Sequence, residues 1–176
     1  TSYSYDGVGN TKKVTDALGH ATSYQHDANG NMISSTDRNG NTTSYTYDAE
    51  NRMTSVKDAE GNVTRYEYDA LGQMTKTVSP MGAESSSAYD AQGRQVKETN
   101  ALGYATHLEY DVLGRVVKTT YANGATLAYT YDENGQVLTA ANELGDTVSY
   151  TYDANGKVTS MTDAMGGVTA YTYDGC

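Results

Sequence analysis

Apolar and polar residues alternate along many short stretches of this chain. In the stretch 43–47 (TSYTY) and its equivalent 148–152 (VSYTY), Thr or Val and two tyrosines occupy every second position. Side chains two residues apart lie on the same face of a β-strand. These stretches therefore predict strands that carry their tyrosines on one face.

Two sets of turns separate the strands. Most have a polar residue followed three positions later by glycine, as in 69–72 (DALG) of the first set and 58–61 (DAEG) of the second. The Asp side chain can accept a hydrogen bond from the backbone two residues on, and glycine supplies the positive φ of a bulged hairpin. Two exceptions fit this prediction: Asn51 replaces a turn glycine and tolerates the left-handed conformation, and Pro80 suits the second position of a type I turn.

The return strands are harder to read. Six of them begin with an apolar residue, but their later positions mix Lys, Ser, Thr and Val on both faces, so the alternation assigns no register. Counting both kinds, the chain predicts about 16 antiparallel strands of roughly 6 residues. Large twisted sheets rarely stay flat, so we expect this one to curl into a spiral or a tube wall. The apolar first residues are Met32, Met53, Met74, Val116, Val137 and Val158.

The pattern has a fixed period of 21 residues, which is typical of a repeat architecture. Two columns hold 15 of the 17 tyrosines, and in each the predicted role is structural. The first column is a Tyr-Asp pair, with His26-Asp27 as its exception: Tyr5-Asp6, Tyr47-Asp48, Tyr68-Asp69, Tyr89-Asp90, Tyr110-Asp111, Tyr131-Asp132, Tyr152-Asp153 and Tyr173-Asp174. The second column is Tyr3, Tyr24, Tyr45, Tyr66, Tyr129, Tyr150 and Tyr171, and the first-set turn glycines are Gly30, Gly72, Gly93, Gly114, Gly135 and Gly156.

The fold class predicted is therefore all-β, with antiparallel hairpin repeats of 21 residues forming a curled or spiral sheet. We expect residues 1–176 to be a single array of about eight repeats without an internal boundary. Because the sequence opens and closes partway through a repeat, we also expect it to be a fragment of a longer chain.

Charge and apolar content exclude two classes of partner. The formal net charge is −10 with no cluster of Lys or Arg, so the backbone of a nucleic acid would be repelled. No apolar run approaches the ~18 residues that a membrane span requires, so no membrane span is predicted.

The motif Tyr-Asp-x-x-Gly-Arg, as in 89–94 and 110–115, resembles the YD-repeat or Rhs family along the whole chain. That family includes bacterial Rhs toxins, the B and C subunits of insecticidal toxin complexes, wall-associated proteins and teneurins. The resemblance implies a segment of a hollow β-shell in a secreted or cell-surface protein, which encloses or presents another polypeptide. The family's closing segment, with its autoproteolytic Asp-Pro-x-Gly-Leu motif, is not in this sequence.

The repeated side chains also allow functional interpretations. The tyrosine columns could stack on sugars, but cross-strand pairing explains them better, with hydroxyls that face water. Segment 27–31 (DANGN) faintly resembles a calcium loop but lacks the remaining ligands, and turn capping explains its Asp. We therefore predict no metal and no cofactor.

No catalytic residues are predicted either. The three histidines, His20, His26 and His107, have no metal or triad spacing, and the single cysteine, Cys176, has no His partner in sequence. We expect no enzyme in this segment.

One region is less regular, with Ser87, Glu98, Leu108 and Tyr121 in place of the usual residues, and is either a contact patch or repeat drift.

Three functions follow as hypotheses. The first is a shell segment that encloses or presents a polypeptide cargo, most simply a toxin domain of a secreted bacterial protein. The second is an adhesive module that binds cell-wall carbohydrate through the tyrosine rows. The third is a fibre subunit that joins neighbouring copies end to end through open strand edges, with Cys176 as an available covalent link.

Overall fold

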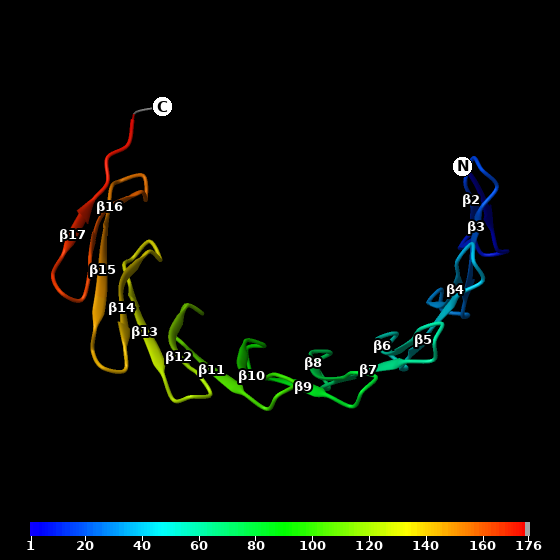
Figure 1. Cartoon of the computed structure of the whole chain (residues 1–176), viewed down its shortest axis with the longest axis horizontal. Coiled ribbons are helices and arrows are strands. Elements are labelled where there is room, and N and C mark those ends of the chain that lie inside the picture. Colours follow the sequence, from blue (N-terminus) through cyan, green and yellow to red (C-terminus); the bar gives the residue numbers. More distant parts are fainter. Residues whose placement is uncertain (175–176) are drawn as a thin grey trace. The chain divides into compact units, whose positions relative to one another are not determined.

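The computed structural model describes residues 1–174, and those residues form strands and turns without any helix (Figure 1). Seventeen strands belong to one open antiparallel sheet, and each strand pairs with the next along the sequence. The prediction of an all-β hairpin array is confirmed. The count exceeds the expected 16 because partial repeats at both ends also form strands. No segment that could cross a membrane as a helix is present in the described part of the chain.

The chain divides into two compact units, Thr1–Ser86 and a second that begins at Ser87. The first contains β1 (Ser2–Tyr5), β2 (Thr11–Thr15), β3 (Ala21–His26), β4 (Met32–Thr36), β5 (Thr42–Tyr47), β6 (Met53–Lys57), β7 (Val63–Tyr68), β8 (Met74–Val78) and the start of β9 (Glu84–Tyr89). The second contains the end of β9, β10 (Gln95–Thr99), β11 (Ala105–Tyr110), β12 (Val116–Thr120), β13 (Thr126–Tyr131), β14 (Val137–Asn142), β15 (Thr147–Tyr152), β16 (Val158–Thr162) and β17 (Val168–Ala170). The prediction of a single array without a boundary stays a prediction.

The turns have the geometry that the sequence predicts. In the first-set turn after β7, the Gly72 amide donates to the Asp69 carbonyl at 3.1 Å and Gly72 has a φ of 85°. Asn51 takes the same place with a φ of 63° and is the only non-glycine residue at positive φ among the described residues. Pro80 lies in a turn that closes from Gly82 to Ser79 at 2.9 Å. The predicted αL position of the turn glycines is therefore confirmed.

A β-bulge in seven of the return strands explains why their register could not be assigned. In the hairpin of β5 and β6, Tyr47 faces Met53 and Tyr45 faces Val56, and the register shifts by one residue between these pairs. The extra residue, Thr54, shares the opposite face with Thr46, whose hydroxyl lies 2.9 Å from its own. Positions three apart in the sequence thus reach the same face, which a strict period of two cannot reveal.

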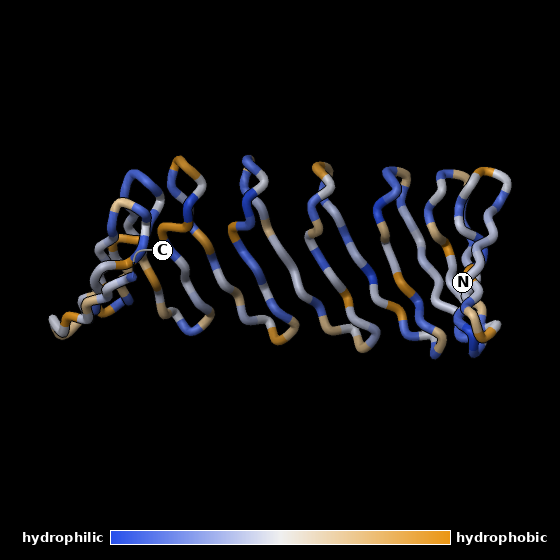
Figure 2. The backbone as a smooth tube through the Cα atoms, turned by 90° about the horizontal axis from the view of Figure 1, so that it is seen from above, coloured by the Kyte–Doolittle hydropathy of each residue, from blue (hydrophilic) through white to orange (hydrophobic). Residues whose placement is uncertain are grey.

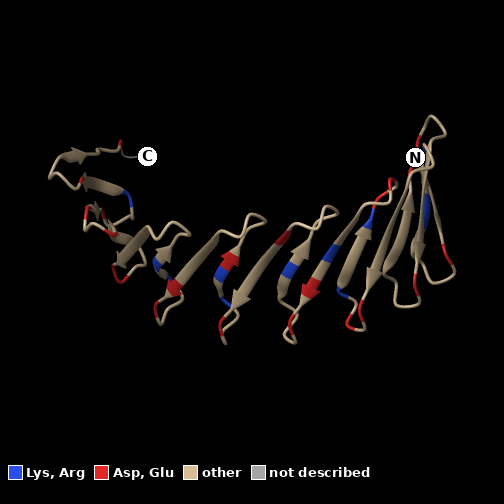
Figure 3. Cartoon of the chain, turned by 60° about the horizontal axis from the view of Figure 1, so that its bottom comes forward, with Lys and Arg blue, Asp and Glu red and all other residues tan. Residues whose placement is uncertain are grey.

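The sheet therefore has two chemically different faces. The tyrosine face carries both tyrosine columns, the Met or Val that begins most return strands, and Thr43 with its equivalents. The other face carries the strand-borne lysines, as in the pair of Lys118 and Glu109, whose charged groups lie 3.4 Å apart. Figure 3 shows Lys and Arg on several strands, and Asp and Glu at many turns and on some strands.

No hydrophobic side chain among the described residues is fully buried. The one buried residue is Thr119, which is 8% exposed, and most tyrosines of the columns are half-buried. Apolar side chains at several turn tips are almost fully exposed, including Leu18, Met81 and Met165, and Figure 2 shows such residues in orange at the hairpin ends. A single sheet has no second layer to cover its faces, so its stability depends on contacts between adjacent hairpins.

Candidate functional site

The first tyrosine column links most hairpins to the ones before them. The ladder between β6 and β7 ends at the pair of Ser55 and Arg65, and Met53 lies beyond it. The Tyr68 hydroxyl donates a hydrogen bond to the Met53 carbonyl at 2.8 Å. This hydroxyl therefore satisfies a backbone carbonyl where the two strands have separated. Equivalent bonds of 2.5–2.9 Å join Tyr47 to Met32, Tyr110 to Gln95, Tyr131 to Val116, Tyr152 to Val137 and Tyr173 to Val158.

These bonds differ from the expectation that the tyrosine hydroxyls stay hydrated. In the first column, the hydroxyl is a donor to protein, and this explains why Phe cannot replace Tyr there without loss of a bond. In the second column, Tyr45 and Tyr66 make no hydrogen bond through their hydroxyls to any described residue. The two columns therefore have different roles, although their sequence pattern is the same.

The Asp of each Tyr-Asp pair caps its own turn. One carboxylate oxygen of Asp48, Oδ1, accepts hydrogen bonds from the backbone amides of Glu50 at 3.0 Å and Arg52 at 2.9 Å. The second oxygen, Oδ2, accepts from Arg52 Nε at 2.7 Å. Both carboxylate oxygens thus accept hydrogen bonds from the turn that Asp48 begins, as capping requires. The same two backbone amides donate to Oδ1 at the turns that begin with Asp6, Asp27, Asp69, Asp90, Asp111, Asp132 and Asp153.

Arginine after the turn glycine links each hairpin to the following one. Arg115 Nε donates to its own turn at Asp111 Oδ2, 2.6 Å away, and its Nη1 donates to the Asp132 carbonyl at 2.9 Å. Its guanidinium also lies over the Tyr131 ring, 4.7 Å from the centroid. One side chain therefore contacts the carboxylate of one repeat and the tyrosine and turn of the next. Arg52 and Arg94 make the same three contacts.

Other residues at the Arg position make weaker versions of this link. Gln136 donates to the Gly156 carbonyl at 3.0 Å, and Lys157 lies over the Tyr173 ring at 4.9 Å. Asn31 donates to Asn51 Oδ1 at 2.7 Å, so Asn51 also connects two turns. Sequence reasoning missed these links, and the signal that could have found them is the co-occurrence of Arg after the glycine with the next Tyr-Asp pair.

The titration behaviour of these groups follows from the contacts. The Asn62 carboxamide donates to Asp58, and this hydrogen bond with the adjacent backbone amides lowers the pKa of the Asp58 carboxyl below its usual 3.8. Burial, followed by the nearby Tyr45 and Asp27, raises the pKa of Tyr47 above its usual 10.0. Both shifts belong to structural contacts and indicate no reaction chemistry.

The chemically reactive residue types do not converge. Within residues 1–174, no group of three or more His, Cys, Asp or Glu side chains could hold a metal ion. His20 contacts Asp16 within its own turn, Nδ1 to Oδ2, at 2.9 Å, and His107 lies on the face opposite the tyrosines, in register with Lys97. The thiol of Cys176 lies outside the described residues.

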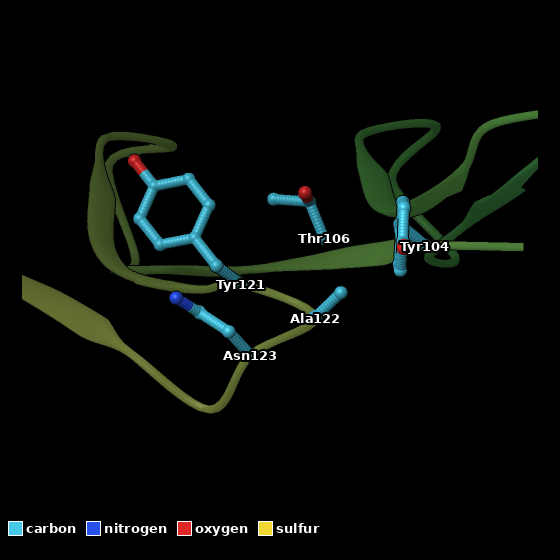
Figure 4. A pocket seen from close by; sticks show the side chains of 5 residues that line it. All are labelled: Tyr104, Thr106, Tyr121, Ala122 and Asn123. Atoms are coloured by element: carbon cyan, nitrogen blue, oxygen red, sulfur yellow. The ribbon is translucent and has the colours of Figure 1, made fainter. Parts of the chain in front are cut away.

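One groove departs from the repeat pattern. It is lined by Tyr104, Thr106, Tyr121, Ala122 and Asn123 of the second unit and has a volume of about 530 Å³. Figure 4 shows the two tyrosine rings on either side of Thr106. Tyr104 and Tyr121 belong to neither tyrosine column, and only the irregularity at Tyr121 was visible in the sequence.

One protein-family model matches this sequence in several places along the chain. The model of the family described as RHS Repeat matches residues 5–41, 26–63, 52–84, 89–126, 131–164 and 152–176. These matches together cover most of the chain. The comparison with curated proteins gives no match.

Two solved structures have a similar fold. The crystal structure of TcdB2-TccC3 aligns with a TM-score of 0.68 and 21% identity over 88% of this chain and 10% of that chain. The structure of a Photorhabdus luminescens Tc holotoxin pore with a substitution in TccC3 aligns with a TM-score of 0.67 and 20% identity over 88% of this chain and 9% of that one. The chain thus spans about a tenth of the length of these solved chains.

Proposed function

Because the chain belongs to the RHS repeat family, we propose that it is a structural segment of a β-sheet wall that encloses or presents another polypeptide. The function is mechanical in this proposal, and no reaction takes place on the segment. Its wider context would be a secreted or cell-surface bacterial protein with a toxin domain as cargo. The fold that this chain shares with part of a Tc holotoxin supports that context.

The observation that carries the proposal is the set of side-chain links between adjacent hairpins. Tyr68 binds the preceding hairpin through the Met53 carbonyl, and Arg52 binds the following turn through the Asp69 carbonyl. Most repeats are thus linked on both sides, and within residues 1–174 no second layer covers either face of the sheet. A wall needs this arrangement, because it must be continuous and extend by addition of identical units.

The same links support the absence of catalysis. The Asp carboxylates of the Tyr-Asp pairs already accept two backbone amides in most repeats, and the paired tyrosine hydroxyls already donate to carbonyls. A general acid, base or nucleophile needs a group that is free to reach substrate. These repeated groups serve the wall instead.

A protease-protection experiment tests enclosure. The intact gene product, with every segment that flanks this chain, is expressed with an epitope tag in the polypeptide that follows the repeats and is treated with protease. We expect that polypeptide to survive far longer than the same polypeptide expressed alone. The matched control combines Arg52→Ala, Arg94→Ala and Arg115→Ala, which removes three turn-to-turn links and should shorten the survival of the tag.

Equal digestion of the attached polypeptide and its isolated form would refute enclosure. In that case, binding of cell-wall glycans by the intact protein would favour the adhesive module, and concentration-dependent fibres would favour the assembly hypothesis.

A further inference from the structure

The groove in the second unit begins with the loss of a turn cap. Tyr121 stands where the other second-set turns carry Asp, Asn or Ser. Asn100 and Asn142, at the equivalent position, each accept two backbone amides through Oδ1. In the Tyr121 turn, only the Ala125 amide has a side-chain acceptor, Asn123 Oδ1 at 3.1 Å. At this position the capping side chain is replaced by the ring of Tyr121, which is 41% exposed.

A second exposed ring faces the same groove. Tyr104 is 61% exposed and lies two residues before Thr106, which belongs to the tyrosine face of β11. Tyr121 lies two residues after Thr119, which shares that face. Neither tyrosine hydroxyl makes a hydrogen bond to a described residue. Both rings therefore remain available on the tyrosine face.

The only carboxylate among the strand residues on this face of the second unit is beside the groove. Glu98 is directly opposite Thr106 in the ladder of β10 and β11, so their Cβ atoms are about 5 Å apart. Lys97, Lys118 and Glu109 lie on the other face. No described Lys or Arg forms an ion pair with Glu98, whose side chain is exposed.

Tyrosine rings of this sheet already hold cations. The guanidinium of Arg94 lies 4.7 Å from the centroid of Tyr110, and the Lys157 ammonium lies 4.9 Å from that of Tyr173. Such contacts arise because the face of an aromatic ring carries negative potential. Tyr104 and Tyr121 present the same rings but receive no described cation from the chain itself.

We propose that Tyr104, Tyr121 and Glu98 form a site for the side-chain cation of a lysine or arginine in a polypeptide that lies on the tyrosine face. The two rings supply cation–π contacts, and Glu98 supplies the opposite charge. The formal charge of −10 adds a general attraction for a basic partner. This inference rests on the proposed function in one respect: the proposed function says where that polypeptide comes from.

The charge of the site selects this ligand among the alternatives. An anion would meet Glu98 without any strand-borne Lys or Arg on the same face to offset it. A neutral sugar could stack on the rings, but it carries no positive charge to pair with Glu98. The test therefore compares ligands that differ only in charge.

Nuclear magnetic resonance titration of the chain provides that comparison. The probes are acetyl-trilysine amide and the same peptide with every side-chain amine acetylated. We expect the charged peptide to shift the signals of Thr106, Asn123 and the rings of Tyr104 and Tyr121, and the acetylated peptide to leave them unchanged. Added salt should weaken the effect, because charges at the surface are screened.

Two variants separate the contributions. Glu98→Gln should lower the affinity about 2- to 5-fold, as expected for an exposed ion pair. Tyr121→Asn removes one of the two rings and should also lower the affinity about 2- to 5-fold. It also restores the cap found at Asn100 and Asn142, so lower stability cannot explain its loss of binding. Glu133→Gln, an equal change of charge on an exposed turn, is the control and should leave the affinity unchanged.

Three results would overturn this inference: equal binding of both peptides, an equal effect of Glu98→Gln and Glu133→Gln, or no shift with the charged peptide at millimolar concentration. Failure of enclosure is distinguishable from these results, because the titration measures the groove alone and the protease experiment measures the wall.

Discussion

At the scale of residues, a hydroxyl group distinguishes the two tyrosine columns. Tyr68 donates to the Met53 carbonyl, whereas Tyr66, two residues earlier on the same strand, makes no hydrogen bond through its hydroxyl to a described residue. Both rings lie on the same face and are half-buried. The chain therefore contains its own matched pair for measuring the energy of one bridge between hairpins.

We predict that Tyr68→Phe lowers the free energy of unfolding by about 0.5–1.5 kcal/mol, the net contribution of a typical hydrogen bond. The ring and its contact with Arg52 remain in this variant, so the loss reports the hydroxyl alone. Tyr66→Phe should change the stability by less than about 0.5 kcal/mol. Urea denaturation followed by circular dichroism measures both, and equal losses for the two variants would contradict the assigned bridge.

The same hydroxyls predict loss of stability at high pH. Burial raises the pKa of Tyr47 and Tyr152 above 10.0, so the folded state holds these protons more tightly than the unfolded state. This contribution is complete below pH 10 and is lost as the pH rises through the folded-state pKa. Thermal melting from pH 9 to pH 12 should show a fall that begins above pH 10, with tyrosinate absorbance rising in parallel. A melting temperature that is constant while tyrosinate forms would exclude the mechanism.

At the scale of elements, the turns depend on one backbone conformation. Gly72 has a φ of 85°, and its missing Cβ would meet only the Arg52 side chain, at 3.9 Å or more. Space is therefore available for a side chain, and the cost of substitution comes from the backbone. We predict that Gly72→Val destabilises by about 1–2 kcal/mol.

Asparagine at the same position is the control for this prediction. Asn51 already adopts a φ of 63° in the equivalent turn, so Gly72→Asn should cost less than Gly72→Val. Urea midpoints of the two variants give the comparison. If Val and Asn cost the same, side-chain crowding rather than backbone conformation limits the turn.

The Asp caps predict a loss of stability in acid. The hydrogen bond from the Asn62 carboxamide lowers the pKa of Asp58, and that from Asn31 lowers the pKa of Asp27. A lowered folded-state pKa contributes stability above the unfolded value of 3.8, and this contribution disappears as the pH falls through the folded-state pKa. Melting temperatures between pH 6 and pH 2 should therefore drop below about pH 4. Measurements in ~1 M salt, where the Debye length is ~3 Å, remove the opposing relief of charge repulsion.

Asp58→Asn provides the matched variant for the acid prediction. Asn100 shows that a carboxamide oxygen accepts the same two backbone amides, so the turn should persist at neutral pH. The carboxyl that titrates is gone, and the loss in acid should be smaller. An unchanged acid transition in this variant would show that the Asp58 cap does not contribute to it.

The strands, turns and tyrosine face followed from the sequence because each depends on local chemistry. Alternation placed Tyr45 and Tyr47 together, and the Asn51 exception anticipated its positive φ. The bulge at Thr54 could not be predicted, since an extra residue leaves no mark on a strand of mixed Lys, Ser and Thr. The groove could not be predicted from the sequence either. Tyr104 and Tyr121 are 17 residues apart, and only the pairing of β11 and β12 brings them to the same groove.

At the scale of the whole molecule, the sheet of the described chain has an open edge at each end. In the ladders of the described chain, β1 pairs with β2 and β17 pairs with β16, so each terminal strand has one open edge. Both strands are exposed along their entire length. An open edge can accept a strand from another copy.

We predict that the 176-residue chain associates end to end or frays at its terminal strands. Light scattering over a concentration series should show growth in mass, or hydrogen exchange should show weak protection in β1 and β17 beside strong protection in the middle of each unit. A monomer with terminal strands as protected as central ones would contradict both alternatives.

The links between neighbouring hairpins have a further consequence for synthesis. Every ladder joins consecutive strands, and the Tyr and Arg bridges reach only to the adjacent repeat. Most β-proteins fold slowly because strands distant in sequence must find each other, whereas low contact order permits fast folding. This chain can therefore fold vectorially, hairpin by hairpin, as it leaves the ribosome. No finished repeat has to wait for a distant one, so additional repeats need not slow the folding of those already made.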